Sequence, residues 1–284
     1  MLVTEGANVN RTRWKDGVHA FGLAALTMLA LGTSGRAWAD QELIKQGEET
    51  FKINLGGIFN QNNTTFRLDG SSGQSREIDL ENAGLDKHPS SFLGEATWRF
   101  AAKHRIGIQT FAIERSASKT TTQDVQLGDN VVPAGTTLSA ESKTQFFIVN
   151  YQYSFIKNDR LEFSGLAGLY GANFKFNFNA TSPAINVDKS TTAPLPVLGA
   201  RLDYFLNPRW TASLFGEAMK ANIGDVDGRV YYAGVSTDYM VTRNFGLGLG
   251  YSLADLQVDV NKGDFHGRIG WRMNSFIGYG QLRF

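Results

Sequence analysis

The chain has 284 residues with a formal net charge of +1, 31 glycines, 20 phenylalanines and no cysteine. The lack of cysteine excludes disulfides and thiolate metal sites, and the balanced charge provides no basic field for nucleic acid. From composition and motifs we expect no metal, no cofactor and no nucleic-acid partner.

Residues 1–39 have the pattern of an export signal. Three basic residues between positions 11 and 15 precede an apolar run at 18–31, and Ala37 and Ala39 form an A-x-A cleavage site. The apolar run is shorter than the roughly 20 residues that a membrane-spanning helix needs. We therefore predict cleavage after Ala39 and a mature chain with nearly equal numbers of basic and acidic residues.

After a polar lead-in at residues 40–50, ten segments alternate apolar and polar residues with the period of two that is typical of β-strands. They are 51–59, 92–100, 105–115, 143–155, a fifth from 161, 195–206, a seventh from 210, one around 231–239, 245–252 and 269–284. The apolar parity changes within the fifth and tenth segments. We expect a bulge at Gly171–Asn173 in the fifth and a register change near Asn274 and Ser275 in the tenth.

The connections alternate between short turns and longer polar loops. The longer loops are predicted at residues 60–91, 116–142, 179–193, 222–228 and 259–264. Transmembrane barrels have short periplasmic turns and longer outer loops, and strands of about 9–11 residues are long enough to cross a bilayer. The sequence therefore predicts an all-β fold, an antiparallel transmembrane β-barrel of ten strands over residues 51–284. Eight strands or twelve are the alternatives.

Seven charged residues fall on faces that the alternation predicts to be inward: Glu95, Arg99, Glu162, Arg201, Asp203, Glu217 and Asp238. The interior of a barrel of about eight strands is filled by side chains. These residues therefore predict an ion-pair network in a narrow lumen rather than a wide pore, and Gly246, Gly248 and Gly250 would leave space for its long side chains. A narrow channel lined by Arg99, Arg201 and Glu217 is the alternative.

The last segment places Phe276, Leu282 and Phe284 on one face. It resembles the closing strand of bacterial outer-membrane β-barrels, in which a terminal Phe is part of the signal read by the barrel-assembly machinery. With the export signal and the aromatic strands, the chain resembles the small outer-membrane β-barrel proteins of Gram-negative bacteria. Residues 78–86 and 195–210 are similar to one proteobacterial subgroup of these proteins. The resemblance implies an integral outer-membrane location and contact with lipid and lipopolysaccharide, and it implies no particular activity.

One pair of residues suggests catalysis. Asp264 and His266 share a strand face, and an aspartate can orient an imidazole as a general base. This spacing looks like part of the omptin protease site, which would need Asp225 and Asp227 as its second acidic pair. We favour a non-enzymatic role in envelope structure, adhesion or narrow solute passage. An outer-membrane hydrolase that acts at the outer rim, either an omptin-like protease or a lipid-modifying enzyme, is the alternative.

Overall fold

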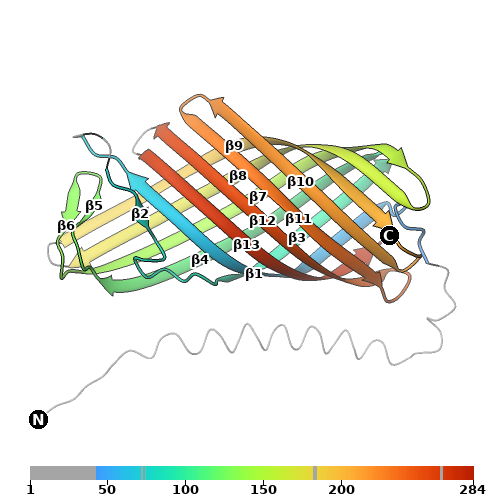
Figure 1. The fold of residues 1–284 in the computed structure, drawn as a ribbon, viewed down its shortest axis with the longest axis horizontal. Helices are drawn as coiled ribbons and strands as arrows, with labels where there is room; N and C mark the ends of the chain where they lie inside the picture. The colour runs from blue at the N-terminus through green and yellow to red at the C-terminus, as the bar shows by residue number, and fades with distance from the viewer. Residues whose placement is uncertain (1–42, 72, 74, 182–183, 263–264) are drawn as a thin grey trace, which may run out of the picture. The chain divides into compact units, whose positions relative to one another are not determined.

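The computed structural model describes residues 43–71, 73, 75–181, 184–262 and 265–284, so the predicted export signal lies outside the described residues. Ten long antiparallel strands form a closed ring, which confirms the predicted ten-stranded barrel (Figure 1). No helix among the described residues is long and apolar enough to cross a bilayer.

The ten barrel strands are β1 (Phe51–Leu68), β3 (Ser90–Ala101), β4 (His104–Thr120), β7 (Thr137–Lys157), β8 (Leu161–Thr181), β9 (Ala184–Phe205), β10 (Trp210–Ile223), β11 (Val226–Met240), β12 (Phe245–Lys262) and β13 (Phe265–Arg283). Each pairs with the next along the chain. β13 then pairs with β1 from Lys52 opposite Arg283 to Leu68 opposite Gly267, and this pairing closes the ring.

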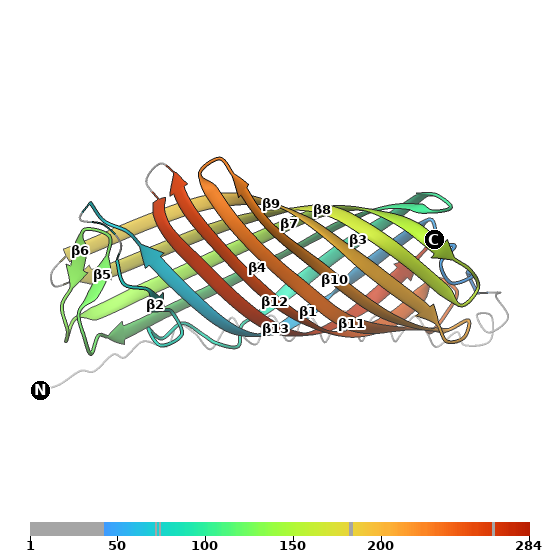
Figure 2. The ribbon, with the colours of Figure 1, turned by 45° about the horizontal axis from the view of Figure 1, so that its top comes forward.

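The two ends of the barrel differ (Figures 1 and 2). The end that we call the turn end carries the carboxyl terminus and the four short turns. The other, which we call the loop end, carries β2 (Ile78–Asp79) and the hairpin of β5 (Val125–Leu127) and β6 (Asn130–Val132).

Three of the predicted long loops are wrong. Strands continue through most of 179–193, 222–228 and 259–264, and the links left between strands are residues 182–183, 224–225 and 263–264. Most barrel strands therefore run for 14–22 residues, well beyond the predicted 9–11. At about 3.3 Å per residue the longest spans roughly 70 Å, which is far more than a tilted crossing of a bilayer needs.

The inside and the outside of the barrel exchange character halfway along the strands. In the turn half, outward side chains form an apolar band, whose members include Phe59, Phe92, Trp98, Phe147, Phe155, Leu198, Leu214, Val235, Leu249 and Phe276, each at least 46% exposed. In the loop half, outward positions such as Asn63 and Asn186 are polar, and Phe174, Phe176 and Phe178 face inward with at most 2% exposure. The turn half therefore has an apolar outside, and the loop half has a polar outside around a buried apolar core.

This inversion corrects two predicted irregularities. β7 and β8 keep one register through Gly171–Asn173, so the expected bulge is absent. β13 keeps one register with both neighbours through Asn274 and Ser275. Side-chain direction alternates without interruption along both strands, and only the side on which apolar residues are needed changes.

The loop half is packed like the interior of a soluble protein, and we call this packing the apolar core. Phe66 of β1 lies 4.7 Å from Phe176 and 5.3 Å from Phe178, measured between ring centroids. The loop-end segments contribute Leu80 and Leu127, both fully buried. Burying one such side chain contributes roughly 1.5–3 kcal/mol, so the core holds the loop half together and blocks its axis.

Candidate functional site

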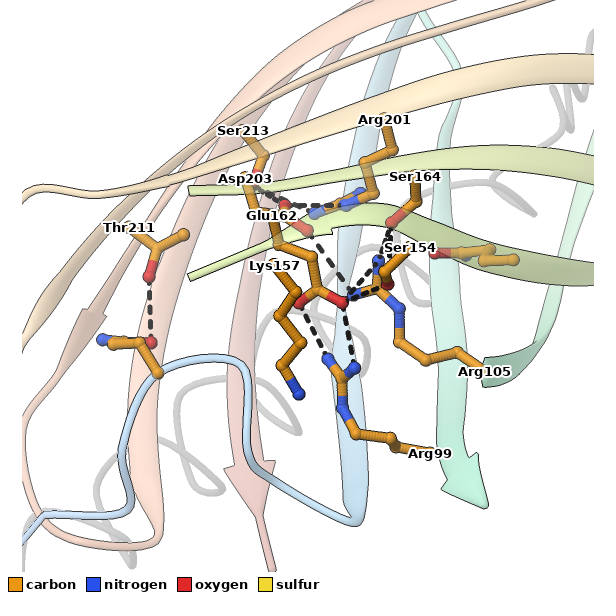
Figure 3. Close-up of polar contacts among 12 residues, drawn as sticks. Arg99, Arg105, Ser154, Lys157, Glu162, Ser164, Arg201, Asp203, Thr211 and Ser213 are labelled. Atoms are coloured by element: carbon orange, nitrogen blue, oxygen red, sulfur yellow. Dashed lines mark hydrogen bonds and ion pairs between the residues drawn. The ribbon is translucent and has the colours of Figure 1, made fainter. Parts of the chain in front are cut away.

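The turn half of the interior contains a connected set of buried charges, which we call the polar lumen network (Figure 3). Arg99 of β3 binds Glu162 of β8 through two parallel hydrogen bonds, each 2.9 Å long. Ser154 donates a further hydrogen bond of 2.5 Å to Glu162. The side chains of Glu162 and Arg99 are 1% and 6% exposed, so each buried charge is compensated by the other.

Asp203 of β9 is the second centre of the network. Its carboxylate accepts hydrogen bonds from Arg201 Nε at 2.8 Å and from Ser213 Oγ at 2.7 Å. Arg105 of β4 lies between the two centres, 3.7 Å from Glu162 and 3.5 Å from Asp203. The network thus runs across the lumen from β3 and β4 to β8, β9 and β10.

Strand register brings these residues together. Glu162 is directly opposite Asp203 in the β8–β9 ladder, and Ser164 is opposite Arg201. The two carboxylates would repel each other, and the arginine between them compensates this repulsion. Arg105 is absent from the predicted inward set because apolar residues occur on both faces of its strand, with Ile106 and Ile108 on one and Ile113 on the other.

A second group of polar residues closes the turn end. Asp238 accepts a hydrogen bond of 2.5 Å from Tyr279 and lies 3.8 Å from Arg283 Nη2. Gln46, from the predicted lead-in, bonds Arg283, accepts a hydrogen bond of 2.9 Å from Thr211 and donates one of 3.0 Å to the Pro208 carbonyl. The segment before β1 therefore lies across the mouth of the barrel and is tied to β13, to β10 and to the turn between β9 and β10.

The lead-in is also held at the surface by an ion pair. Lys45 Nζ lies 2.8 Å from Asp159 in the turn between β7 and β8 and 3.3 Å from Glu48. The hydrogen bond with Lys45 lowers the pKa of Asp159, and the same bond raises the pKa of Lys45. The pair is solvated, so it orients the segment more than it stabilises the fold.

The remaining two residues of the predicted lumen set are less tightly paired. Glu95 and Glu217 line a small cavity of roughly 90 Å³ in the middle of the barrel, together with Lys52 and Arg201. Glu217 accepts a hydrogen bond of 2.5 Å from Tyr170. We predicted that the inner glycines would make room for long charged side chains, and for two of them this is wrong. The ring of Tyr279 lies over Gly248, and Met240 lies over Gly246.

A second cavity, of roughly 60 Å³, lies just above, where polar lining gives way to apolar lining. Its walls are mostly apolar and aromatic, from Phe111, Phe146, Tyr170, Val230 and Trp271. Trp271 donates a hydrogen bond of 3.0 Å to Asn62, which fixes the indole in the wall. The cavity suits an uncharged molecule far better than an ion.

Two residues of the alternative catalytic site, His266 and Asp227, lie on the outer face of the barrel wall. Asp264 lies outside the described residues. His266 shares the outward parity of Phe276 on β13 and bonds Asn261, while Asp227 is exposed on the outer side of β11. In the described part of the chain, no three His, Cys, Asp or Glu residues are grouped so that they could hold a metal ion.

The residues of the predicted assembly signal lie on the outside of the barrel. Phe276, Leu282 and Phe284 are 67%, 37% and 55% exposed. The amide of Phe284 donates to the carbonyl of Phe51, and its carbonyl accepts from the amides of Thr50 and Phe51. The last residue is thus joined to the first barrel strand.

Comparison with known proteins agrees with this architecture. No family model and no curated protein matches the sequence. Among solved structures, the chain is similar to the outer membrane protease OmpT from Escherichia coli, with 9% identity, a TM-score of 0.54 and coverage of 86% of this chain and 99% of that one. Weaker matches include Ail of Yersinia pestis (12% identity, TM-score 0.34, 84% and 99% covered) and the toluene transporter TodX of P. putida (7% identity, TM-score 0.32, 83% and 90% covered).

The similarity to OmpT, at this identity, shows the fold. The chain has the fold of the small outer-membrane β-barrels of Gram-negative bacteria, as the resemblance of its strands implied. None of these structures is similar enough in sequence to indicate the activity of this chain.

Proposed function

We propose that this protein is a non-enzymatic, integral outer-membrane barrel that does not conduct along its axis and that supports a rigid β-structure above the lipid. The turn end, with the lead-in, faces the periplasm, and the loop end faces outward. This orientation agrees with the predicted export signal.

The exchange of inside and outside halfway along the strands carries this proposal. An outward apolar band is stable only against lipid, whereas outward Asn63 and Asn186 above it suit water. The loop half therefore stands above the membrane as a folded extension, a form suited to envelope structure or adhesion.

The lumen is occluded at several levels, which supports the proposal that the barrel does not conduct along its axis. Gln46 covers the turn end, the Arg99–Glu162 pair crosses the lumen above it, and Phe66 and Phe176 fill the loop half. An ion that crossed would have to break a buried ion pair and enter an apolar core, and each step is costly.

Lipopolysaccharide is the partner that we propose for the outer surface. Four arginines on outward positions of the loop half, Arg67, Arg229, Arg268 and Arg272, are each held by an aspartate. A guanidinium has five N–H donors, so one aspartate leaves donors free for a phosphate group. We call these four residues the arginine belt.

Planar-bilayer recording tests the function. The reconstituted protein should show no discrete conductance steps, while a sixteen-stranded porin inserted under the same conditions should. Protein that is inserted, as shown by retention in the membrane after a urea wash, but gives reproducible steps would overturn the non-conducting barrel in favour of the narrow channel.

A further inference from the structure

Backbone pairing along the barrel wall stops early between β9 and β10. Pairing between β9 and β10 runs from Phe205 opposite Thr211 to Leu198 opposite Ala218 and ends there. β9 continues for 14 more residues toward the loop end, to Ala184, and β10 continues to Ile223. The neighbouring pairs, β8–β9 and β10–β11, stay paired to their tips. We call the unpaired stretch between β9 and β10 the seam.

Two prolines explain why the ladder ends at this point. The amide of Phe205 donates to the carbonyl of Arg160 on the β8 side, and that of Leu206 donates to Trp210 on the β10 side. Because backbone direction alternates along a strand, Pro194 and Pro196 would direct their nitrogens at β10. Proline has no N–H to donate, so continued pairing with β10 is prevented and pairing with β8 is not affected.

Side chains alone close the seam. Leu195 of β9 lies on Gly228 of β11, at the place where a Cβ on Gly228 would be. Leu195, Val197 and Val230 are 3%, 1% and 4% exposed, so the closure is dry and apolar. Separating the two edges would break no backbone hydrogen bond between them, in contrast to the β8–β9 and β10–β11 edges on either side.

The seam lies next to the apolar cavity. Tyr170 and Val230 line that cavity. Tyr170 is the register partner of Leu195, and Val230 is the register partner of Met219 on the other side of the seam. Below the seam, the hydrogen bond between Tyr170 and Glu217 joins β8 to β10 and connects the wall of the apolar cavity to the wall of the polar one.

The seam also begins at the level where the outer surface leaves the lipid. Leu198, at its lower end, is 67% exposed in the apolar band, whereas Lys220, two residues above Ala218 on β10, is exposed and charged. A molecule that passes through the seam would therefore come from the edge of the outer leaflet and not from bulk water.

We propose that the seam is a lateral entrance through which a small, uncharged, apolar molecule moves between the membrane and the cavity beside Trp271. This goes beyond the proposed function, since a barrel that is closed to ions along its axis can still admit an apolar molecule through its wall. Apolar cavities of modest size stay dry and take up such molecules.

A lock across the seam tests the entrance. The chain has no cysteine of its own, and a Cβ on Gly228 would lie 3.7 Å from Leu195 Cγ, so the double variant Leu195→Cys/Gly228→Cys should form a disulfide. The variant is made in a background in which Trp271 is the only tryptophan, with Trp14, Trp38, Trp98 and Trp210 replaced by Phe. Chloroform, a small apolar quencher, is mixed with the protein in vesicles, and Trp271 fluorescence is followed over time.

We expect chloroform to quench Trp271 in the reduced protein and acrylamide, which is polar, to quench it little. Oxidation should slow quenching by chloroform at least fivefold, and reduction should restore it. The control pair Ser236→Cys/Gly250→Cys, on fully paired strands, should have no such effect. Equal rates in the oxidised and reduced forms, or equal quenching by acrylamide and chloroform, would overturn the entrance. These results are independent of the conductance test.

The prolines give a second test that needs no disulfide. Pro194→Thr/Pro196→Thr restores two N–H donors facing β10 and should allow the ladder to extend. Quenching by chloroform should then slow in the same direction as in the oxidised variant. A folded variant with unchanged quenching and newly protected amides at both positions would show that the seam is not the route.

Discussion

Glu162 joins two buried arginines in the lumen. It accepts two hydrogen bonds from Arg99, one from Ser154, and lies near Arg105. Replacing one partner of a buried pair leaves the other charge uncompensated, so Glu162→Gln should lower the free energy of unfolding by about 3–5 kcal/mol. Denaturant titration of the protein in lipid vesicles measures this free energy of unfolding. Glu114→Gln, which removes the exposed pair with Lys143, should change stability by less than about 1 kcal/mol; equal losses would argue against a buried network.

A second prediction at this scale concerns Asp159. Its pKa is lowered by Lys45, so the ion pair is present above the ordinary value of about 3.9 and is lost as the pH falls through the lowered pKa. The midpoint, followed by carboxyl ¹³C chemical shift, should lie below 3.9 and return toward it in Lys45→Ala. A midpoint that is the same in both proteins would mean that the lead-in does not lie against this turn in solution.

Among the elements, β1 shows the exchange of inside and outside within one strand. Leu55 and Gln61 both point outward, but Leu55 lies in the middle of the apolar band and Gln61 lies above it. Leu55→Arg should lower stability by about 2–4 kcal/mol, as for a charge facing lipid. Gln61→Arg should stay within about 0.5 kcal/mol. Folding measurements in vesicles compare the two variants, and a similar penalty at both positions would place Gln61 in lipid as well.

The same exchange marks what could be predicted from the sequence. Alternation, turn chemistry and the closing Phe284 were sufficient for ten strands, because period two is a local property of the chain. The loop half was misinterpreted: Phe174 and Trp271 change apolar parity, and a local pattern does not reveal whether the strand shifts or the solvent outside it changes. The partners of Glu162 depend on registers between strands far apart in sequence, and the seam depends on where a ladder stops.

For the whole molecule, the arrangement separates three environments along one axis. The apolar band meets lipid, the polar lumen network fills the space inside it, and the apolar core holds the part above the membrane. Each zone uses the alternating strand differently, so a single continuous wall can be stable both in lipid and in water. Closure between β13 and β1 makes the zones one cooperative structure.

Within the arginine belt, Arg229 and Arg272 lie closest to the apolar band, and this position leads to a prediction about lipopolysaccharide. Arg229 and Arg272 share Asp255, and the side chain of Arg272 is 74% exposed. Because each arginine near an anionic surface contributes about 1 kcal/mol, Arg229→Gln/Arg272→Gln should weaken binding to lipopolysaccharide roughly tenfold or more, and less so at high salt. Titration of the reconstituted protein with purified lipopolysaccharide measures this. The control variant Arg160→Gln/Arg243→Gln removes the same charge from turns at the opposite end of the barrel, and it should bind lipopolysaccharide as the parent does. An equal loss of affinity in both variants would mean that binding depends on net charge and not on the arginine belt.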